Sequence, residues 1–210
     1  RKKSDVHFLC SFLVELDREE NFLANCKVKN VSAYTKKEYS FSLQKAPLKH
    51  PPIVVGFGPA GIFAALTLAR AGLKPLVIER GRDVDARTKD VNLFFTKSIL
   101  DETSNVQFGE GGAGAFSDGK YNITTQFGGD LHNYVGHDKA LELMEYVDDI
   151  NMRYGGEGTK LYSTAGTKFK KECVQNDLHL LDASVRHLGT DINYVVLENL
   201  YADLKDKVTF

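Results

Sequence analysis

A glycine-rich turn between two apolar runs constrains the fold of this chain more than any other feature. Residues 53–55 resemble a short buried strand, GFGPAG follows at 56–61, an Ala- and Leu-rich helix comes next, and a second strand is expected at 75–78. Glu79 stands at the tip of that second strand. A strand, a GxGxxG turn, a helix, a strand and an acid in this order are typical of a dinucleotide-binding βαβ unit. The sequence therefore predicts an α/β protein with a Rossmann-like fold.

Each residue of the turn has a physical role in this interpretation. Gly56 makes the tight turn off the strand, Gly58 lets the backbone approach a pyrophosphate, and Gly61 lets the helix pack closely on the strand. Pro59 suits the first position of the helix, because its missing N–H is not needed there. Ala60 follows it, where unpaired N–H groups and the helix dipole favour a phosphate.

The residues after the second strand refine the expected ligand. We expect Glu79 to accept a hydrogen bond from a ribose 2′-OH, and an acid at this place disfavours the 2′-phosphate of NADP. Arg80, Arg82 and Arg87 follow closely. Their guanidinium groups are suited to stacking on adenine or pairing with phosphate, but a solvated helix start with Asp83 as the N-cap explains them equally well.

A second glycine-rich segment lies at 108–120. Its glycines stand at 109, 111, 112, 114 and 119, more than a simple turn needs. Such a run lets the backbone pass along a flat or anionic ligand and present N–H donors to it. Gly111, Gly112, Ala113 and Gly114 are the expected contacts, with Ser117 and Lys120 as polar partners of a phosphate or ring edge; a flexible surface loop is the alternative.

The composition limits the other possibilities. With 210 residues, 42% of them hydrophobic, and a formal net charge of −1, the chain is expected to be soluble and cytoplasmic, with no nucleic acid or membrane as a partner. Its three cysteines form no CxxC pair, and His132 and His137 are not spaced like ligands one helical turn apart, so no metal site is expected. The beginning at Arg1 and the strand-like residues 207–210 suggest a piece of a longer protein.

We expect three regions along the chain. Residues 1–46 are predicted to form a small α+β unit, with strands at 6–14 and near 39–43 and a short helix at 18–23. Residues 47–52 are a Pro-containing linker. The nucleotide-binding domain spans 53–210 and is expected to be incomplete at its C-terminal end.

Local patterns place further elements within this domain. An apolar set between 91 and 100 predicts a helix that packs on the fold. Helices are also expected at 139–154, 168–176 and 192–204, the last capped by Thr190 or Asp191, with a strand at 178–181 and a connector at 184–190.

Four segments carry a resemblance to a known family: GFGPAGIFAALTLARAG, VIERG, NVQFGEGGAGAFSDGK and VRHLGTD. They resemble the N-terminal portion of the bacterial uncharacterised FAD-dependent dehydrogenases, which are flavoproteins with two dinucleotide-binding domains. The resemblance implies that Gly56, Gly58 and Gly61 hold the FAD pyrophosphate and Glu79 the adenosine ribose. It also implies that residues 111–120 lie along the pyrophosphate and isoalloxazine. The segment 119–124 is similar to a GKCNLTN-like signature of a related flavoprotein family, with Tyr121 in place of its cysteine.

The expected function is therefore that of an FAD-dependent oxidoreductase of the dehydrogenase type, acting on a small molecule, with NAD(P)H as a candidate electron donor. An NAD-dependent dehydrogenase is one alternative, and a non-redox binding or RNA-modifying protein with a structural FAD is another. No catalytic acid, base or cysteine pair stands out. Lys120 is expected near the flavin ring, and weak FAD binding or an empty site is expected of the 210-residue piece alone.

Overall fold

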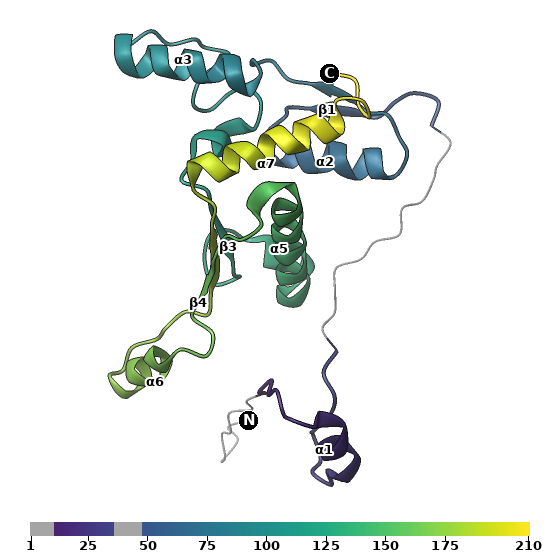
Figure 1. Ribbon diagram of the computed structural model, residues 1–210, viewed down its shortest axis with the longest axis vertical. Coiled ribbons are helices and arrows are strands. Elements are labelled where there is room, and N and C mark those ends of the chain that lie inside the picture. The colour runs from purple at the N-terminus through teal and green to yellow at the C-terminus, as the bar shows by residue number, and fades with distance from the viewer. Residues whose placement is uncertain (1–10, 36–47) are drawn as a thin grey trace, which may run out of the picture. The chain divides into compact units, whose positions relative to one another are not determined.

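The computed structural model describes residues 11–35 and 48–210 (Figure 1). Contacts divide the chain into two compact units, Arg1–Glu38 and Tyr39–Phe210. In the first unit the described residues contain one helix, α1 (Glu19–Asn25), close to the helix expected at 18–23. Residues 11–14 are not a strand, contrary to the prediction for this end of 6–14, and the strand expected near 39–43 lies outside the described residues.

The second unit begins with the predicted βαβ arrangement. Strand β1 (Ile53–Val55) leads through the glycine turn to helix α2 (Pro59–Arg70), and the chain returns as β2 (Leu76–Ile78). The two strands are parallel, with Val54 opposite Val77. Gly72 follows the end of α2 with a φ of +76°, and the N–H groups of Gly72 and Leu73 donate back to the carbonyl oxygens of Ala69 and Leu68.

The last residues of the chain lie beside β2. Thr209 forms a parallel bridge with Leu76: the N–H of Val77 donates to the carbonyl oxygen of Thr209 over 2.7 Å, and the N–H of Thr209 donates to Pro75 over 2.9 Å. The expected strand at 207–210 is thus a single bridge. It lies on the opposite edge of β2 from β1, so this small sheet has parallel backbone on both sides of β2.

Helix α3 (Val84–Lys97) begins at the N-cap that one of the two interpretations of this segment gave: the Asp83 side chain accepts a 2.9 Å hydrogen bond from the N–H of Ala86. The prediction that the apolar residues between 91 and 100 pack on the fold is largely wrong. Val91 is buried, but Phe95 is exposed, and 99–100 lie beyond the helix end. Glycine-rich residues then form a short 3-10 helix, η1 (Gly112–Phe116).

A second, antiparallel sheet follows, in the order β3-β5-β4. Its strands are β3 (Lys120–Ile123), β4 (Leu161–Ser163) and β5 (Ser184–His187). The prediction of a connector at 184–190 was wrong, because residues 184–187 of that range form strand β5. The strand predicted at 178–181 does not form. Val185 pairs with Asn122 on one side and Tyr162 on the other, so β5 is the central strand.

The helices of this part differ in length and place. They are α4 (Leu131–Val135), α5 (His137–Asn151) continued by a π-helical turn η2 (Met152–Gly156), α6 (Lys168–Gln175) and α7 (Gly189–Leu204). α7 starts without the side-chain cap expected from Thr190 or Asp191, and the Thr190 hydroxyl instead donates to the carbonyl oxygen of Ser117 over 3.1 Å. The partly buried Arg186 of β5 binds Asp148 of α5 through Nε and Nη2, and this pair fixes the sheet to the helix.

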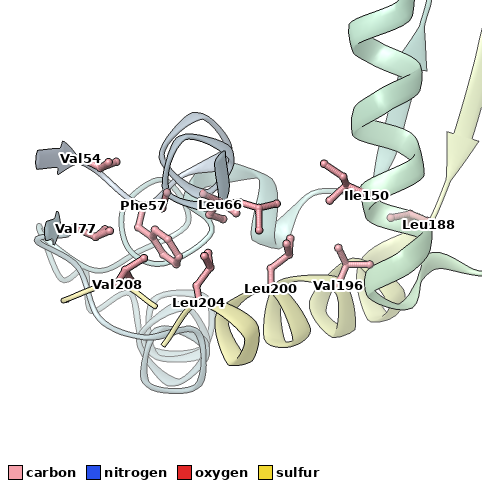
Figure 2. Close-up of a cluster of buried hydrophobic side chains, with 12 residues drawn as sticks. Val54, Phe57, Leu66, Val77, Ile150, Leu188, Val196, Leu200, Leu204 and Val208 are labelled. Atoms are coloured by element: carbon pink, nitrogen blue, oxygen red, sulfur yellow. The ribbon is translucent and has the colours of Figure 1, made fainter. Parts of the chain in front are cut away.

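One continuous core joins the two parts of this unit (Figure 2). α7 runs beside α2 and contributes Val196, Leu200 and Leu204, which are spaced to share one helix face. Leu204 packs with the βαβ unit, whereas Val196 lies towards Ile150 of α5. The apolar face of α7 therefore holds the βαβ unit and the antiparallel part in one body.

Candidate functional site

The turn after β1 is held by the carboxylate of Glu79. Its Oε2 accepts a 2.7 Å hydrogen bond from the N–H of Phe57, and its Oε1 accepts a 2.8 Å bond from Gly81. The N–H of Gly56, at a φ of +90°, donates to Ile78. The acid thus lies at the carboxyl ends of both parallel strands, where sheets of this kind bind ligands. Its oxygens retain further acceptor capacity beyond these two bonds.

Helix α2 begins without a side-chain cap. Gly58 is its N-cap and Pro59 holds the first helical position, so no side-chain oxygen covers this end. The first N–H groups of a helix have no partner within the helix and carry partial positive charge. Ala60 is exposed here, and the helix start is therefore open to an anion.

Gly61 sets the separation between α2 and the turn. A Cβ at this position would lie 1.9 Å from the carbonyl oxygen of Gly56 and 3.5 Å from the side chain of Val54. Any side chain would push the helix away from the strand. The geometry agrees with the packing role predicted for this glycine.

The structure brings the two glycine-rich segments together. The N–H of Gly111 donates a 2.9 Å hydrogen bond to the carbonyl oxygen of Phe57. A Cβ on Gly112 would lie 3.0 Å from the Cα of Gly58 and 3.2 Å from the Cδ of Pro59. The missing side chains therefore serve, first of all, the close packing of one backbone segment on the other.

The rest of the second segment is less enclosed. Ala113 is exposed at the start of η1, and Ser117 donates its hydroxyl to the carbonyl oxygen of Gly114 over 2.8 Å. The Nζ of Lys120 pairs with Asp118 at 2.7 Å, and both side chains are more than half exposed. The hydrogen bond from Lys120 is the main reason that the pKa of Asp118 is lowered. The ligand contacts expected of Ser117 and Lys120 stay predictions.

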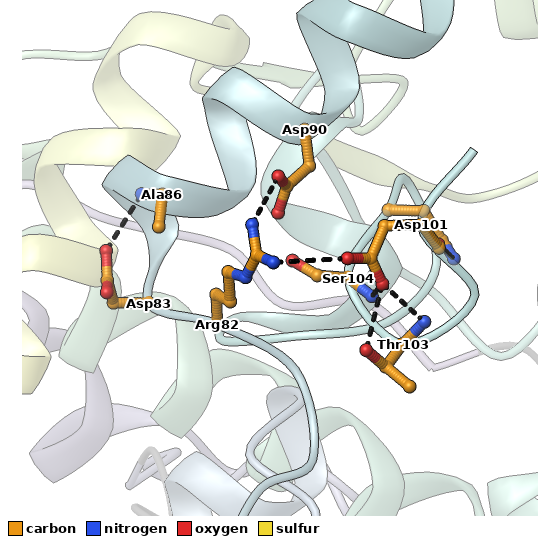
Figure 3. A network of polar contacts seen from close by, with 8 residues as sticks. Arg82, Asp83, Ala86, Asp90, Asp101, Thr103 and Ser104 are labelled. Atoms are coloured by element: carbon orange, nitrogen blue, oxygen red, sulfur yellow. Dashed lines mark hydrogen bonds and ion pairs between the residues drawn. The ribbon is translucent and has the colours of Figure 1, made fainter. Parts of the chain in front are cut away.

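The three arginines after β2 have different surroundings. Arg82 forms ion pairs with Asp90 at 2.7 Å and with Asp101 at 3.3 Å (Figure 3). Asp101 in turn accepts hydrogen bonds from Thr103 and Ser104, and the backbone bond from Thr103 contributes most to lowering its pKa. Arg82 thus ties the start of α3 to the loop at 101–104.

Arg87 is fully buried and binds three backbone carbonyl oxygens. Nε donates to Asn105 over 2.7 Å, Nη2 to Val106 over 2.9 Å, and Nη1 to Glu110 over 2.5 Å. Burial lowers its pKa, and nearby acids oppose this effect. Arg87 therefore shapes the approach to the second glycine segment, and its donors are used within the chain.

Arg80 remains at the surface. Its guanidinium carbon lies 3.9 Å from the ring centroid of Phe108, in a cation–π stack. A guanidinium stacked in this way forms a flat platform of the kind on which a planar base stacks. Of the three arginines, Arg80 is the one whose position best fits the stacking interpretation.

Two cavities are lined by residues of both glycine segments. The first has a volume of about 350 Å³ and includes Glu79 in its wall. The second has a volume of about 340 Å³ and lies between α2, α5 and α7. Both fall in the range of small-molecule sites, about 300–1,000 Å³. From the glycine segments, Phe57 and Glu110 line the first cavity, and Pro59, Ala60, Gly111 and Gly114 line the second.

Glu110 is an unusual wall residue, because its carboxyl group is buried. It accepts a 2.8 Å hydrogen bond from the N–H of Val84, at the start of α3. Desolvation raises the pKa of Glu110, and the bond from Val84 opposes that shift. The first cavity thus contains two carboxyl groups in different surroundings. Glu79 is fixed by two backbone N–H groups, and Glu110 is held in a less polar setting.

The second cavity contains a small polar cluster that the sequence did not reveal. The hydroxyl of Tyr121 donates a 2.6 Å hydrogen bond to Asn193, whose Nδ2 donates to the carbonyl oxygen of Gly114 over 2.9 Å. Burial raises the pKa of Tyr121. Asn151 lines the same cavity at 2% exposure, and its Nδ2 has no hydrogen-bond partner among the described residues. Leaving a buried donor unpaired costs about 1–3 kcal/mol.

A signal for these asparagines was nevertheless present. Asn193 precedes Val196 by three positions and Leu200 by seven, so it interrupts the apolar face of α7. Asn151 follows Val147 by four positions on α5. A buried amide in an apolar stripe requires a hydrogen-bond partner. An asparagine at such a position was therefore the sequence signal for a polar contact in the core.

Other candidate chemistry is sparse. The rings of His132 and His137 stack with centroids 4.5 Å apart, but within residues 11–35 and 48–210 no three His, Cys, Asp or Glu side chains are grouped to hold a metal ion. Over the same residues, no helix has the length and apolar character needed to cross a bilayer.

Comparisons with known proteins give one informative match. The chain is 40% identical over 195 residues to a protein of Clostridium beijerinckii that is described as uncharacterised. The match covers 92% of this chain and 34% of the relative, so the chain spans about a third of that protein's length. No family model matches the chain.

Proposed function

We propose that this chain is the nucleotide-binding part of an FAD-dependent oxidoreductase of the dehydrogenase type, built on a Rossmann-like fold. The observation that carries the proposal is the direct contact between the two glycine-rich segments beside Glu79 and the open start of α2. A single glycine turn would be sufficient to bind a mononucleotide. Two in contact, with a cavity on either side, suit a longer dinucleotide.

The residues present fit such a ligand. The uncapped N-terminus of α2 would receive the pyrophosphate, and Glu79 would accept a hydrogen bond from the adenosine ribose. Arg80 would stack beside the adenine. The acid at position 79 disfavours NADP, because its 2′-phosphate would lie against a carboxylate. When bound, the flavin supplies the electron transfer, and the protein positions and tunes it.

The substrate and electron donor belong to the wider proposal. A small-molecule substrate and NAD(P)H are the partners that the proposed class would use. The C. beijerinckii relative is about three times the length of the matched region, so residues equivalent to its remainder are where substrate contacts are expected.

Isothermal titration of the purified chain with FAD, ADP, NAD⁺ and NADP⁺ tests the proposal. We expect FAD to bind most tightly and NADP⁺ most weakly. Glu79→Gln should weaken FAD and ADP together by roughly 10-fold, the range of a hydrogen bond to a charged group. The exposed Glu157→Gln is the matched control and should change neither. Tighter binding of NAD⁺ than of FAD would favour an NAD-dependent dehydrogenase. Failure of both this chain and the longer C. beijerinckii relative to bind any of the four would refute the proposal.

A further inference from the structure

The cavity between α2, α5 and α7 has an apolar wall and one unmet hydrogen-bonding requirement. The apolar wall is formed from three helices by Ile62, Phe63, Val147, Val196, Leu197 and Leu200. A cavity of this composition suits a largely apolar, flat or branched group. It is not simply a packing defect, because a buried amide also lines it.

The polar residues of the cavity differ in what they offer a ligand. Asn193 is engaged at both atoms, since its oxygen accepts from Tyr121 and its nitrogen donates to Gly114. Asn151 is equally buried, yet its Nδ2 donor has no partner among the described residues. A buried donor of this kind calls for an acceptor, and a ring carbonyl is one.

The place of the cavity gives the second part of the argument. The contacting segments separate it from the cavity that contains Glu79: Phe57 and Glu110 face that first cavity, whereas Ala60 and Gly111 face the second. The open start of α2 lies at this boundary. A dinucleotide has the same order of parts, with a ring system at each end and a pyrophosphate between them.

We propose that the second cavity receives the isoalloxazine end of FAD, and that Asn151 donates a hydrogen bond from Nδ2 to a ring carbonyl. This inference rests on the proposed function. It assigns Glu79 to the adenosine end and Asn151 to the flavin end. Asn151 is a positioning and tuning residue in this assignment, because a donor at a ring carbonyl stabilises the negative charge that the ring gains on reduction.

Binding of FAD and of ADP to the same variants tests the assignment, because ADP lacks the flavin end. Asn151→Leu should weaken FAD binding about 5-fold, the effect of one neutral hydrogen bond, and leave ADP binding unchanged. Val147→Phe, which fills the cavity from α5, should also weaken FAD selectively. The exposed Asn133→Leu is the matched control and should alter neither ligand.

A second measurement reports on the ring itself. The midpoint potential of bound FAD should fall in Asn151→Leu, because the reduced ring loses a donor, and it should be unchanged in Asn133→Leu. Circular dichroism melting checks folding. Removal of an unpaired buried amide is not expected to lower the melting temperature.

The outcomes separate this inference from the proposed function. If the unmodified chain binds FAD no more tightly than ADP, or if Asn151→Leu and Val147→Phe leave FAD binding unchanged, the flavin end lies elsewhere while the nucleotide site stands. Equal weakening of FAD and ADP by both cavity variants would mean a general structural effect and would also refute the assignment. If neither FAD nor ADP binds to this chain or to the longer C. beijerinckii relative, the proposed function and this inference fail together.

Discussion

The N–H of Gly111 donates a 2.9 Å hydrogen bond to the carbonyl oxygen of Phe57. This bond fixes the second glycine-rich segment on the first, so the candidate site depends on tertiary structure and not on the βαβ unit alone. Residues far apart in the chain must be folded together before the two cavities exist. Changes that separate the segments should therefore affect stability and ligand binding at once.

Gly61→Ala should destabilise the protein strongly. The added methyl would meet the carbonyl oxygen of Gly56 at 1.9 Å, and relief of that overlap requires the helix or the turn to move. We expect the free energy of unfolding in urea to fall by about 1–3 kcal/mol or more. Gly114→Ala is the control, since its Cβ would meet only Pro59, at an ordinary 3.7 Å. Equal losses in the two variants would contradict the packing role of Gly61.

Arg87→Met should loosen the loop that leads to the second glycine segment. The substitution leaves the partly or fully buried carbonyl oxygens of Asn105, Val106 and Glu110 without their charged donor. We expect a loss of about 3 kcal/mol or more in unfolding free energy. Hydrogen exchange should also rise at 105–110. The exposed Arg153→Met is the comparison, and a similar small effect from both changes would show that Arg87 does not hold the loop.

The buried Glu110 predicts a pH dependence of stability. Because burial raises its pKa, its stabilising contribution is fully present below the ordinary pKa of Glu, about 4.3, and is lost as the pH rises through the raised value. Glu110→Gln does not titrate and can still accept a hydrogen bond from Val84. The stability of this variant relative to the unmodified chain should therefore increase as the pH rises across this window.

Urea unfolding at a series of pH values measures that difference. Glu157→Gln is the control, because Glu157 is exposed and its removal should give no comparable trend. A difference for Glu110→Gln that stays constant with pH, or that decreases towards neutral pH, would show that ionised Glu110 is not disfavoured in the folded protein.

The ion pair of Lys120 with Asp118 offers a test of the predicted flavin contact. If the pair lies near the ring, Lys120→Met should lower the midpoint potential of bound FAD, and Asp118→Asn should raise it, because the two charges have opposite signs. A redox titration of each variant compares them directly. An unchanged potential in both would place residues 118–120 away from the flavin.

Local signals in the sequence were sufficient for the elements that depend on them. The cap at Asp83 relies on neighbouring residues, and it was one of the two interpretations that the sequence offered for this segment. Strand β5 was missed because its pairing is non-local: Val185 becomes strand by lying between Asn122 and Tyr162. The apolar run at 178–181 has no such partners, and no strand forms there.

The candidate site shows the same division. The residues of both glycine segments could be chosen from the sequence, because glycine at these spacings limits what the backbone can do. The hydrogen bond from Gly111 to Phe57 could not be predicted, since no local pattern specifies which distant carbonyl oxygen a loop N–H will meet. The second cavity was missed for this reason, because Asn151 and Asn193 come together only through the packing of α5 and α7.

The bridge between Leu76 and Thr209 has a consequence for synthesis on the ribosome. At about 5–20 residues per second, roughly 10 s pass between the emergence of β2 and that of its second neighbour. During that interval the far edge of β2 has unpaired N–H and C=O groups, and unpaired strand edges promote association with other chains. The nascent protein is therefore expected to depend on chaperones most while residues 79–208 are being made.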